Sequence, residues 1–492
     1  YKKGWIDFNK NGKKDIYEDP TQDIEKRIDD LLSQMNLDEK TCQLATYYGY
    51  RKALKDSVPT AEWKTNILKD GIANVDEHLN KEIGDPNTLA TALAETQRFF
   101  VEYTRLGIPA DFTNEGIRGL NARSATSFPS MNGLGCTWDK ELAYRQGVIE
   151  GREARAMGYT NIYAPILDVA RDQRWGRWEG AIGEDPYLVA RIGVAMSKGI
   201  QSQRVVSTPK HYVGYGDCKA ARQWDSRTDP HVTPSEMHYI HEEAGALGVM
   251  CAYNDYDGVP MAGNYHYLTE VLRKEMGFKG YVVSDSYAIG RLNGVHKVTP
   301  NFKESGRKAI EAGLNVRTEF NDPTEYITNI RELVKEGRLS MKRVDEMVRD
   351  VLYVKFWLGL FDNPYTGSTR KASDIVSCEE HLNTALRASR ECLVLLKNAD
   401  NMLPFHTRYR KIAVIGPNAH SKDYIPAHYG PMGFQRFFSV VDGLKSVYKH
   451  DDVEINYVKG IDIVSPGWPE NELMCDTLTA GEQQSIQEAV EL

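Results

Sequence analysis

The segment Gly280–Ser286 reads GYVVSDS, a run of mostly apolar, partly β-branched residues that ends in polar ones. This composition predicts a strand buried on both faces, as in a parallel sheet. The same pattern, an apolar segment with a polar end, recurs along the first two thirds of the chain. The other segments of this kind are Pro109–Asn114, Asn161–Leu167, Val205–Tyr212, Gly248–Asn254 and Ala312–Thr318.

Helical periodicity fills most of the intervals between these strands, for example in Trp138–Met157 and Thr269–Met276. Alternation of strands and helices predicts parallel sheet, and alternation over about 300 residues favours a (β/α)8 TIM-like barrel over an open sheet. The chemistry of such barrels lies at the C-terminal ends of the strands, which is where the polar residues fall here. We therefore expect an α/β protein with its site at that end of the barrel.

A second α/β pattern follows the barrel. Residues Thr366–Ser377 are polar and rich in turn formers, which is typical of a linker. The elements predicted next are a helix at His381–Arg390 and strands at Cys392–Leu396, Lys411–Ile415 and Val453–Val458. The predicted organisation is an N-terminal segment at 1–22, a catalytic barrel at 23–362, a linker at 363–378 and an α/β sandwich domain at 379–492.

A capping box at Thr479–Glu482 predicts a helix close to the end of the sequence. In a parallel α/β domain such a helix leads into a further strand, but the sequence ends at Leu492. We therefore expect the α/β sandwich domain to be C-terminally incomplete in this sequence.

Composition narrows the class of protein. The 492 residues carry a formal net charge of −8, which does not favour nucleic acid as a partner. No apolar run approaches the roughly 20 residues that span a bilayer. Seven cysteines without a CxxC pair do not predict a zinc cage. The chain starts at Tyr1, so we expect a removed leader and a periplasmic or secreted protein, and a homodimer stays open.

The N-terminal segment contains a candidate calcium loop of twelve residues, DFNKNGKKDIYE. Oxygen-bearing side chains fall at loop positions 1, 3, 5, 9 and 12, glycine falls at position 6, and position 7 offers a backbone carbonyl, as in an EF-hand. The expected Ca²⁺ ligands are Asp7, Asn9, Asn11, Lys13 through its backbone, Asp15 and Glu18. The alternative is a polar Asn-Gly turn that binds nothing. Because no helix fits before Asp7, we expect a structural site.

Four further segments carry candidate chemistry. They read DVARDQRWGR at 168–177 with GEDPY at 183–187, PKHYVGYG at 209–216, MCAYN at 250–254 and VVSDS at 282–286. In this order and spacing they resemble glycoside hydrolase family 3, the β-glucosidase and β-xylosidase family. The resemblance runs from about Asp23 to the end of the chain and implies the barrel, the second domain and retaining hydrolysis of β-linked terminal sugars.

The resemblance implies that Asp285 is the nucleophile and that Tyr253 hydrogen-bonds to it. Retaining hydrolysis needs a carboxylate beneath the anomeric carbon, and Asp285 closes a strongly apolar strand at the expected end of the barrel. An aspartate at a strand end is otherwise most often a helix cap. The family takes its acid/base glutamate from the second domain, and no residue of this sequence matches it.

Four residues match the family's substrate-binding positions: Glu115, Arg177, Lys210 and His211. Fixed donors that hold the sugar hydroxyls strengthen their contacts in the transition state. The alternatives are an ion pair of Arg177 with Glu184 or Asp185, a core role for His211 and a structural strand-end role for Glu115.

The nature of the sugar is less strongly predicted than the reaction. Glucosidases of the family usually carry aspartate at the position of Glu115, and the longer glutamate crowds the CH2OH group of glucose. Ser286 stands where the family often has tryptophan, which leaves Tyr287 or Trp224 as an aromatic wall. Tyr215 replaces the second histidine of the N-acetylhexosaminidase branch, which disfavours that branch.

The sequence thus predicts a retaining exo-β-glycosidase that hydrolyses terminal β-D-glucosyl residues of oligosaccharides. A β-xylosidase or α-L-arabinofuranosidase is the alternative within the family. A non-catalytic sugar-binding protein is the alternative from another class, because the acid/base residue is missing from the sequence. No cofactor is expected for catalysis.

Overall fold

The computed structural model describes residues 2, 4–173, 175–217, 245–365, 371–405, 409–421, 429–431, 438–462 and 478–492. They form two compact units. The first contains residues 1–393 and 429–432, and the second contains residues 394–428 and 433–492. Trp224 lies outside the described residues.

The first unit is built on parallel strands. One sheet has the order β1-β2-β3-β4-β5 and a second has the order β10-β7-β6. The strands are β1 Thr46–Tyr48, β2 Asn74–Asp76, β3 Asp111–Glu115, β4 Asn161–Tyr163, β5 Val206–Ser207, β6 Lys210–Tyr212, β7 Gly248–Cys251 and β10 Tyr281–Ser284. A small antiparallel hairpin, β8 Asp255–Tyr256 with β9 Val259–Pro260, follows β7.

Isolated parallel bridges join the two sheets into a ring. Ile166 pairs with Lys210 on one side, while Val283 pairs with Val316 and Ala45 with Arg317 on the other. The predicted segment Val205–Tyr212 is one barrel strand that is interrupted between β5 and β6 at Pro209, which has no N–H to donate to a neighbouring strand. If β5 and β6 are counted as one strand and residues 316–317 as another, the ring has the eight strands expected of a (β/α)8 barrel.

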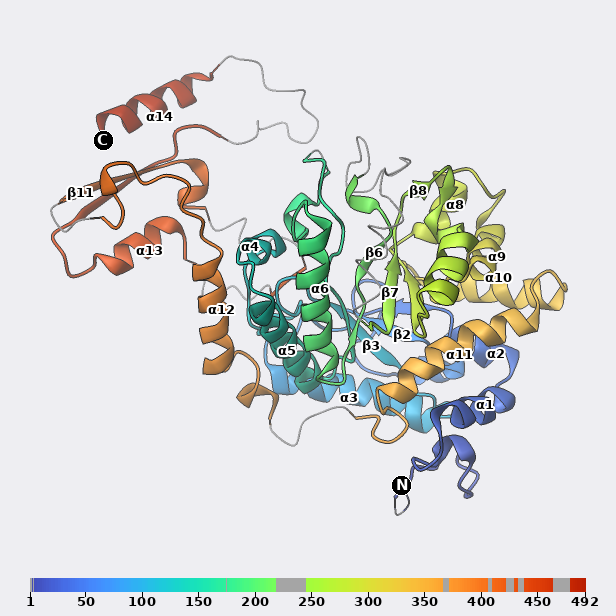
Figure 1. Cartoon of the computed structure of the whole chain (residues 1–492). Helices are drawn as coiled ribbons and strands as arrows, with labels where there is room; N and C mark the ends of the chain where they lie inside the picture. The colour runs from blue at the N-terminus through green and yellow to red at the C-terminus, as the bar shows by residue number, and fades with distance from the viewer. Residues whose placement is uncertain are drawn as a thin grey trace. The chain divides into compact units, whose positions relative to one another are not determined.

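Helices surround these strands (Figure 1). In this unit they are α1 Ile24–Gln34, α2 Leu37–Cys42, α3 Pro86–Tyr103, α4 Met131–Cys136, α5 Lys140–Met157, α6 Pro186–Gln201, α8 Ala288–Gly294, α9 Phe302–Ala312, α10 Thr324–Lys335, α11 Met341–Trp357 and α12 Glu379–Glu391. A π-type helical segment spans His266–Glu275. None of the described helices is long and apolar enough to cross a membrane.

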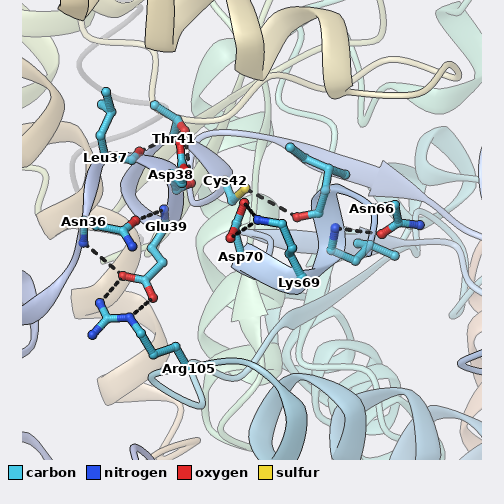
Figure 2. A network of polar contacts seen from close by, with 12 residues as sticks. Asn36, Leu37, Asp38, Glu39, Thr41, Cys42, Asn66, Lys69, Asp70 and Arg105 are labelled. Carbon is cyan, nitrogen blue, oxygen red and sulfur yellow. Dashed lines mark hydrogen bonds and ion pairs between the residues drawn. The ribbon is translucent and has the colours of Figure 1, made fainter. Parts of the chain in front are cut away.

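Local sequence fixes where the helices begin and end. Asp139 caps α5 by accepting hydrogen bonds from the backbone N–H groups of Glu141 and Leu142, and Gly158 ends that helix in a left-handed conformation. At α2, Asn36 and Glu39 form a reciprocal capping box, and Arg105 grips both carboxylate oxygens of Glu39 at 2.8 and 2.5 Å (Figure 2). This contact connects the segment that follows α3 to α2, the helix before β1.

The barrel interior carries a buried polar layer near the N-terminal ends of the strands. The hydroxyl of Tyr281 donates to Asp111 at 2.8 Å and accepts from the amides of Asn74 and Asn161 at 2.9 and 2.6 Å. All four side chains are almost completely buried. The layer links β2, β3, β4 and β10, so it fixes the strands below the site.

The second unit contains a parallel strand pair, β11 Lys411–Ile415 and β12 Glu454–Val458, with α13 Val440–Val447 and α14 Ala480–Glu491. The capping box at Thr479–Glu482 begins α14, as expected. The strand predicted at Cys392–Leu396 is wrong: these residues are irregular, and the leucines among them are exposed rather than paired in a sheet. The expected domain start at 379 also differs, because α12 packs on α4 and α5 of the first unit.

Candidate active site

The predicted site residues come together at the C-terminal ends of the barrel strands. Glu115 closes β3, Lys210 and His211 lie in β6, Tyr253 follows β7 and Asp285 follows β10. Because parallel strands end on the same side, residues far apart in the sequence meet there. All five side chains are buried, with Asp285 the most exposed at 9%.

The two carboxylate oxygens of Asp285 have different surroundings. Oδ1 accepts hydrogen bonds from the hydroxyl of Tyr253 at 2.8 Å and from the backbone N–H of Ser286 at 2.7 Å. Oδ2 is buried and has no hydrogen-bond partner among the described residues. Burial, with Asp285 adding to it, raises the pKa of Tyr253 well above its ordinary value, so the phenol stays a donor. One oxygen is therefore held, and the other is available to react.

Arg177 and Lys210 form a cationic wall beside Asp285, next to the imidazole of His211. The guanidinium of Arg177 contacts Nε2 of His211 at 3.0 Å, and Nζ of Lys210 donates to Glu115 Oε2 at 2.5 Å. Burial lowers the pKa of Lys210, and Glu115 opposes this shift. Nη2 of Arg177 is buried without a hydrogen-bond partner among the described residues, as expected of a donor that awaits a ligand hydroxyl.

The alternative roles of these residues find no support in the geometry. Asp185 is exposed and caps α6, while Glu184 accepts from Gln173 at 3.3 Å, so neither is the partner found for Arg177. His211 is buried, but it lies 3.3 Å from Asp285 Oδ2 rather than in the apolar core. Glu115 binds Lys210 instead of serving only the strand end.

Sequence reasoning missed two residues of the site. Asp168 was part of the first motif but received no role, and its carboxylate lies 2.6 Å from Nδ1 of His211. Tyr429 belongs to the first unit despite its late position in the chain. Its ring centroid lies 4.7 Å from Nζ of Lys210 and 5.2 Å from Cζ of Arg177, within cation–π range.

The backbone around Tyr429 is anchored beside Glu115. The carbonyl of Tyr429 accepts a hydrogen bond from the N–H of Ile117 at 3.0 Å, and the ring of Pro431 approaches Gly119. A lone tyrosine in a polar loop gives no periodic or motif signal, so only the three-dimensional structure could reveal it.

Aromatic rings lie next to the nucleophile on another side. Phe320 packs against Tyr48 and Tyr287, with ring centroids 4.5 and 5.7 Å apart, and Tyr48 hydrogen-bonds to Ser286 at 3.2 Å. Tyr287 and Phe320 are each more than one third exposed. Tyr287, expected as an aromatic wall, is therefore placed beside Phe320.

The N-terminal loop has the internal hydrogen bonds of a folded turn. Glu18 accepts from the N–H of Phe8 at 2.7 Å, and Asp7 Oδ2 accepts from the N–H of Gly12 at 3.1 Å. Asp7 Oδ1 is buried without a partner among the described residues, and the amide of Asn11 donates to Asp15 at 2.8 Å. In the described part of the chain, no group of three or more His, Cys, Asp or Glu side chains has a metal-binding arrangement.

Comparison with known proteins supports the resemblance. Residues 36–354 match the glycosyl hydrolase family 3 N-terminal domain, and residues 393–492 match the C-terminal domain of the same family. A β-xylosidase of Formosa agariphila is 34% identical over 81% of this chain and 60% of its own length. A periplasmic β-glucosidase of Salmonella typhimurium is 29% identical over 89% of this chain and 56% of its own length.

A solved β-glucosidase structure from Erythrobacter marinus superposes with a TM-score of 0.85 at 29% identity, and the match covers 98% of this chain and 65% of that one. The chain thus spans about 60% of the length of these relatives. Both domain matches, together covering most of the sequence, show that the chain belongs to glycosyl hydrolase family 3.

Proposed function

We propose that this chain carries the sugar-binding and nucleophilic machinery of a retaining exo-β-glycosidase. The observation that supports this most directly is the buried carboxylate of Asp285, with Oδ1 held by two donors and Oδ2 without a partner among the described residues. This arrangement suits attack by Oδ2 on an anomeric carbon. The names of the relatives, β-xylosidase and β-glucosidase, agree with the proposal.

In the first step, Oδ2 of Asp285 bonds to the anomeric carbon while the bond to the leaving oxygen breaks and that oxygen takes a proton from a general acid. In the second step, water loses a proton to the conjugate base and attacks the anomeric carbon, and the ester C1–O bond breaks, which restores the carboxylate and the β configuration. Tyr253 and the N–H of Ser286 hold Oδ1 and so orient the carboxylate in both steps. We assign the acid/base role to no residue of this chain.

The cationic wall binds the hydroxyl groups of the terminal sugar. Arg177 offers its unpaired buried Nη2, and Lys210 and Glu115 form a donor and acceptor pair for neighbouring hydroxyls. Because these groups are fixed before the sugar arrives, little reorganisation is needed as charge develops on the ring. The same burial excludes water from the developing cation.

Terminal β-D-glucosyl residues are the proposed substrate, with β-xylosyl as the second candidate. Two observations favour the second candidate. Glu115 reaches the wall with a side chain one methylene longer than aspartate, and Tyr429 covers the cations beside it. Both reduce the space for a CH2OH group.

The N-terminal loop is proposed as a structural Ca²⁺ site. Asp7, Asn9, Asn11, Asp15, Glu18 and the carbonyl of Lys13 supply oxygen atoms only, which suits a hard cation. Asp7 Oδ1 is buried without a partner among the described residues, and a bound cation would neutralise it. The ion would contribute to stability and take no part in hydrolysis.

We further propose a periplasmic or secreted location. Two relatives are named as periplasmic enzymes. The sequence further predicts that nucleic acid is not a partner, and it leaves a homodimer open.

The test of the proposed function is hydrolysis of nitrophenyl β-glucoside and β-xyloside by full-length protein. Asp285→Asn keeps the shape of the side chain and removes its nucleophilicity, so we expect activity to fall by about a thousandfold or more. Asp257→Asn, the same change in the exposed β8–β9 turn, serves as the matched control and should retain activity. Equal rates for the two variants would exclude Asp285 as the nucleophile.

A further inference from the structure

The imidazole of His211 lies between two carboxylates and a guanidinium. Nδ1 is 2.6 Å from Asp168 Oδ2, while Nε2 is 3.0 Å from Nη1 of Arg177 and 3.3 Å from Oδ2 of Asp285. His211, Asp168 and Arg177 are at least nine-tenths buried, and the side chain of Asp285 is 12% exposed. The position of a single proton therefore decides which of these contacts are hydrogen bonds.

The contact with Arg177 fixes that position. A guanidinium has donors and no acceptor, so a 3.0 Å contact with Nε2 is a hydrogen bond only if Nε2 carries a lone pair. The imidazole proton must then be on Nδ1, where the carboxylate of Asp168 accepts it. In the other tautomer, Nε2 would carry the proton at 3.0 Å from the donor Nη1 of Arg177 and 3.3 Å from Oδ2 of Asp285.

This tautomer has a consequence for the nucleophile. Without a proton on Nε2, His211 gives no hydrogen bond to Asp285, which agrees with the absence of a partner on Oδ2. We propose that Asp168 is a positioning residue that fixes the tautomer of His211 and so keeps the attacking oxygen of Asp285 free of a hydrogen bond. A hydrogen bond to that oxygen would stabilise the ground state and slow attack.

The charges around the pair support one shared proton at neutral pH. Burial lowers the pKa of His211 well below its ordinary value, and Arg177 and Lys210 lower it further. Burial raises the pKa of Asp168 to about 7, although Arg177 opposes the shift. The other neighbours are the nucleophile Asp285, whose charge raises this pKa, and the ring of Tyr215, 5.0 Å from the imidazole.

The pH dependence follows from this arrangement. As pH falls through the pKa of Asp168, the carboxyl group binds a proton from solvent and its O–H hydrogen-bonds to Nδ1. The single imidazole proton, which was on Nδ1, is then on Nε2. Nε2 lies 3.3 Å from Oδ2 of Asp285. We therefore expect an acid limb in the rate of nucleophilic attack that belongs to Asp168 and His211 rather than to Asp285 itself.

The inference rests on the proposed function, so its test measures only the rate of nucleophilic attack by Asp285. A 2,4-dinitrophenyl 2-deoxy-2-fluoro-β-glucoside or β-xyloside should label Asp285: the Oδ2–C1 bond forms, the C1–O bond breaks, and dinitrophenolate leaves without needing a proton. Asp168→Asn offers an N–H to Nδ1 and favours the wrong tautomer. We expect it to slow labelling about 10- to 100-fold at neutral pH and to remove the acid limb, with less than about a threefold change in probe affinity.

Three controls separate the explanations. Asp257→Asn is the same change in the exposed β8–β9 turn, and it should label at the wild-type rate. His211→Gln should also lose the acid limb, and Asp168→Asn should add no further loss in that background. Thermal unfolding checks that each variant is folded. If Asp168→Asn does not fold, the pH profile of His211→Gln becomes the test of the proposal.

Each outcome has one meaning. If wild-type protein is not labelled, or if Asp285→Asn is labelled equally, the proposed function fails. If wild-type protein is labelled at Asp285 but Asp168→Asn keeps the wild-type rate and pH profile, only the tautomer proposal fails. Retention of the acid limb in His211→Gln would overturn it as well.

Discussion

At the residue scale, the chemistry of the site depends on which oxygen, nitrogen or methylene group each side chain presents. The two carboxylate oxygens of Asp285 differ in their hydrogen bonding, so only one of them is held by donors. At Glu115 the length of the side chain matters, because its carboxylate contacts Nζ of Lys210 at 2.5 Å. One methylene at that position decides how far the pair extends into the sugar site.

Replacement of Glu115 by aspartate tests the substrate preference. The shorter side chain withdraws the carboxylate from the site and leaves room for a CH2OH group. We expect the kcat/KM ratio of β-glucoside to β-xyloside to rise by about tenfold, the effect of one methylene group in a tight site. Both substrates should be measured with the same variant. An equal loss for both would show that Glu115 binds hydroxyls shared by the two sugars.

The sequence predicted six site residues, and the structure brings them together at one end of the barrel. Glu115, Tyr253 and Asp285 each follow or close an apolar strand, and strand ends of a parallel barrel converge. Asp168 and Tyr429 could not be assigned in the same way. Their places depend on side-chain contacts between segments that are distant in the sequence.

At the element scale, the barrel strands were predicted where they are long or strongly apolar. Six of the eight barrel strands coincide with predicted segments, but β1 (TYY) and β2 (NVD) do not lie in a long apolar segment and gave no signal. The wrong strand at Cys392–Leu396 has the opposite cause. Its residues have high β propensity, but propensity alone does not supply a neighbouring strand.

The N-terminal loop gives a prediction for calcium removal. If the loop binds Ca²⁺, chelation removes a ligand of the folded state and should lower the melting temperature by a few degrees. Asp7→Asn should lower it similarly and abolish the effect of the chelator. Asp19→Asn, just outside the loop, is the control that should still respond to Ca²⁺. An unchanged melting temperature in EDTA would identify the loop as a turn only.

At the scale of the whole molecule, buried ionisable groups make stability depend on pH. Glu150, on α5, is completely buried, and burial raises its pKa to about 8. Its Oε1 accepts from the N–H of Gly119 at 2.8 Å and from Gln146 at 2.9 Å. The folded protein therefore holds a proton that the unfolded chain releases at lower pH.

The sign of the effect follows from this difference in bound protons. Between the ordinary glutamate pKa of 4.5 and about 8, the folded state binds more protons, so stability falls as pH rises. Glu150→Gln removes the titration and should reduce that slope by about 1 kcal/mol per pH unit. The measurement is the unfolding free energy from pH 5 to 8. Glu325→Gln, an exposed glutamate, should keep the wild-type slope.

The anchoring of Tyr429 on the N–H of Ile117 has a consequence for how the protein matures on the ribosome. Every strand of the barrel is synthesised before this tyrosine, so the barrel can close while one wall of the sugar site is still missing. A nascent chain interrupted after the barrel would hold Asp285 but lack that wall. The complete sugar site would then form only after the barrel strands have been synthesised.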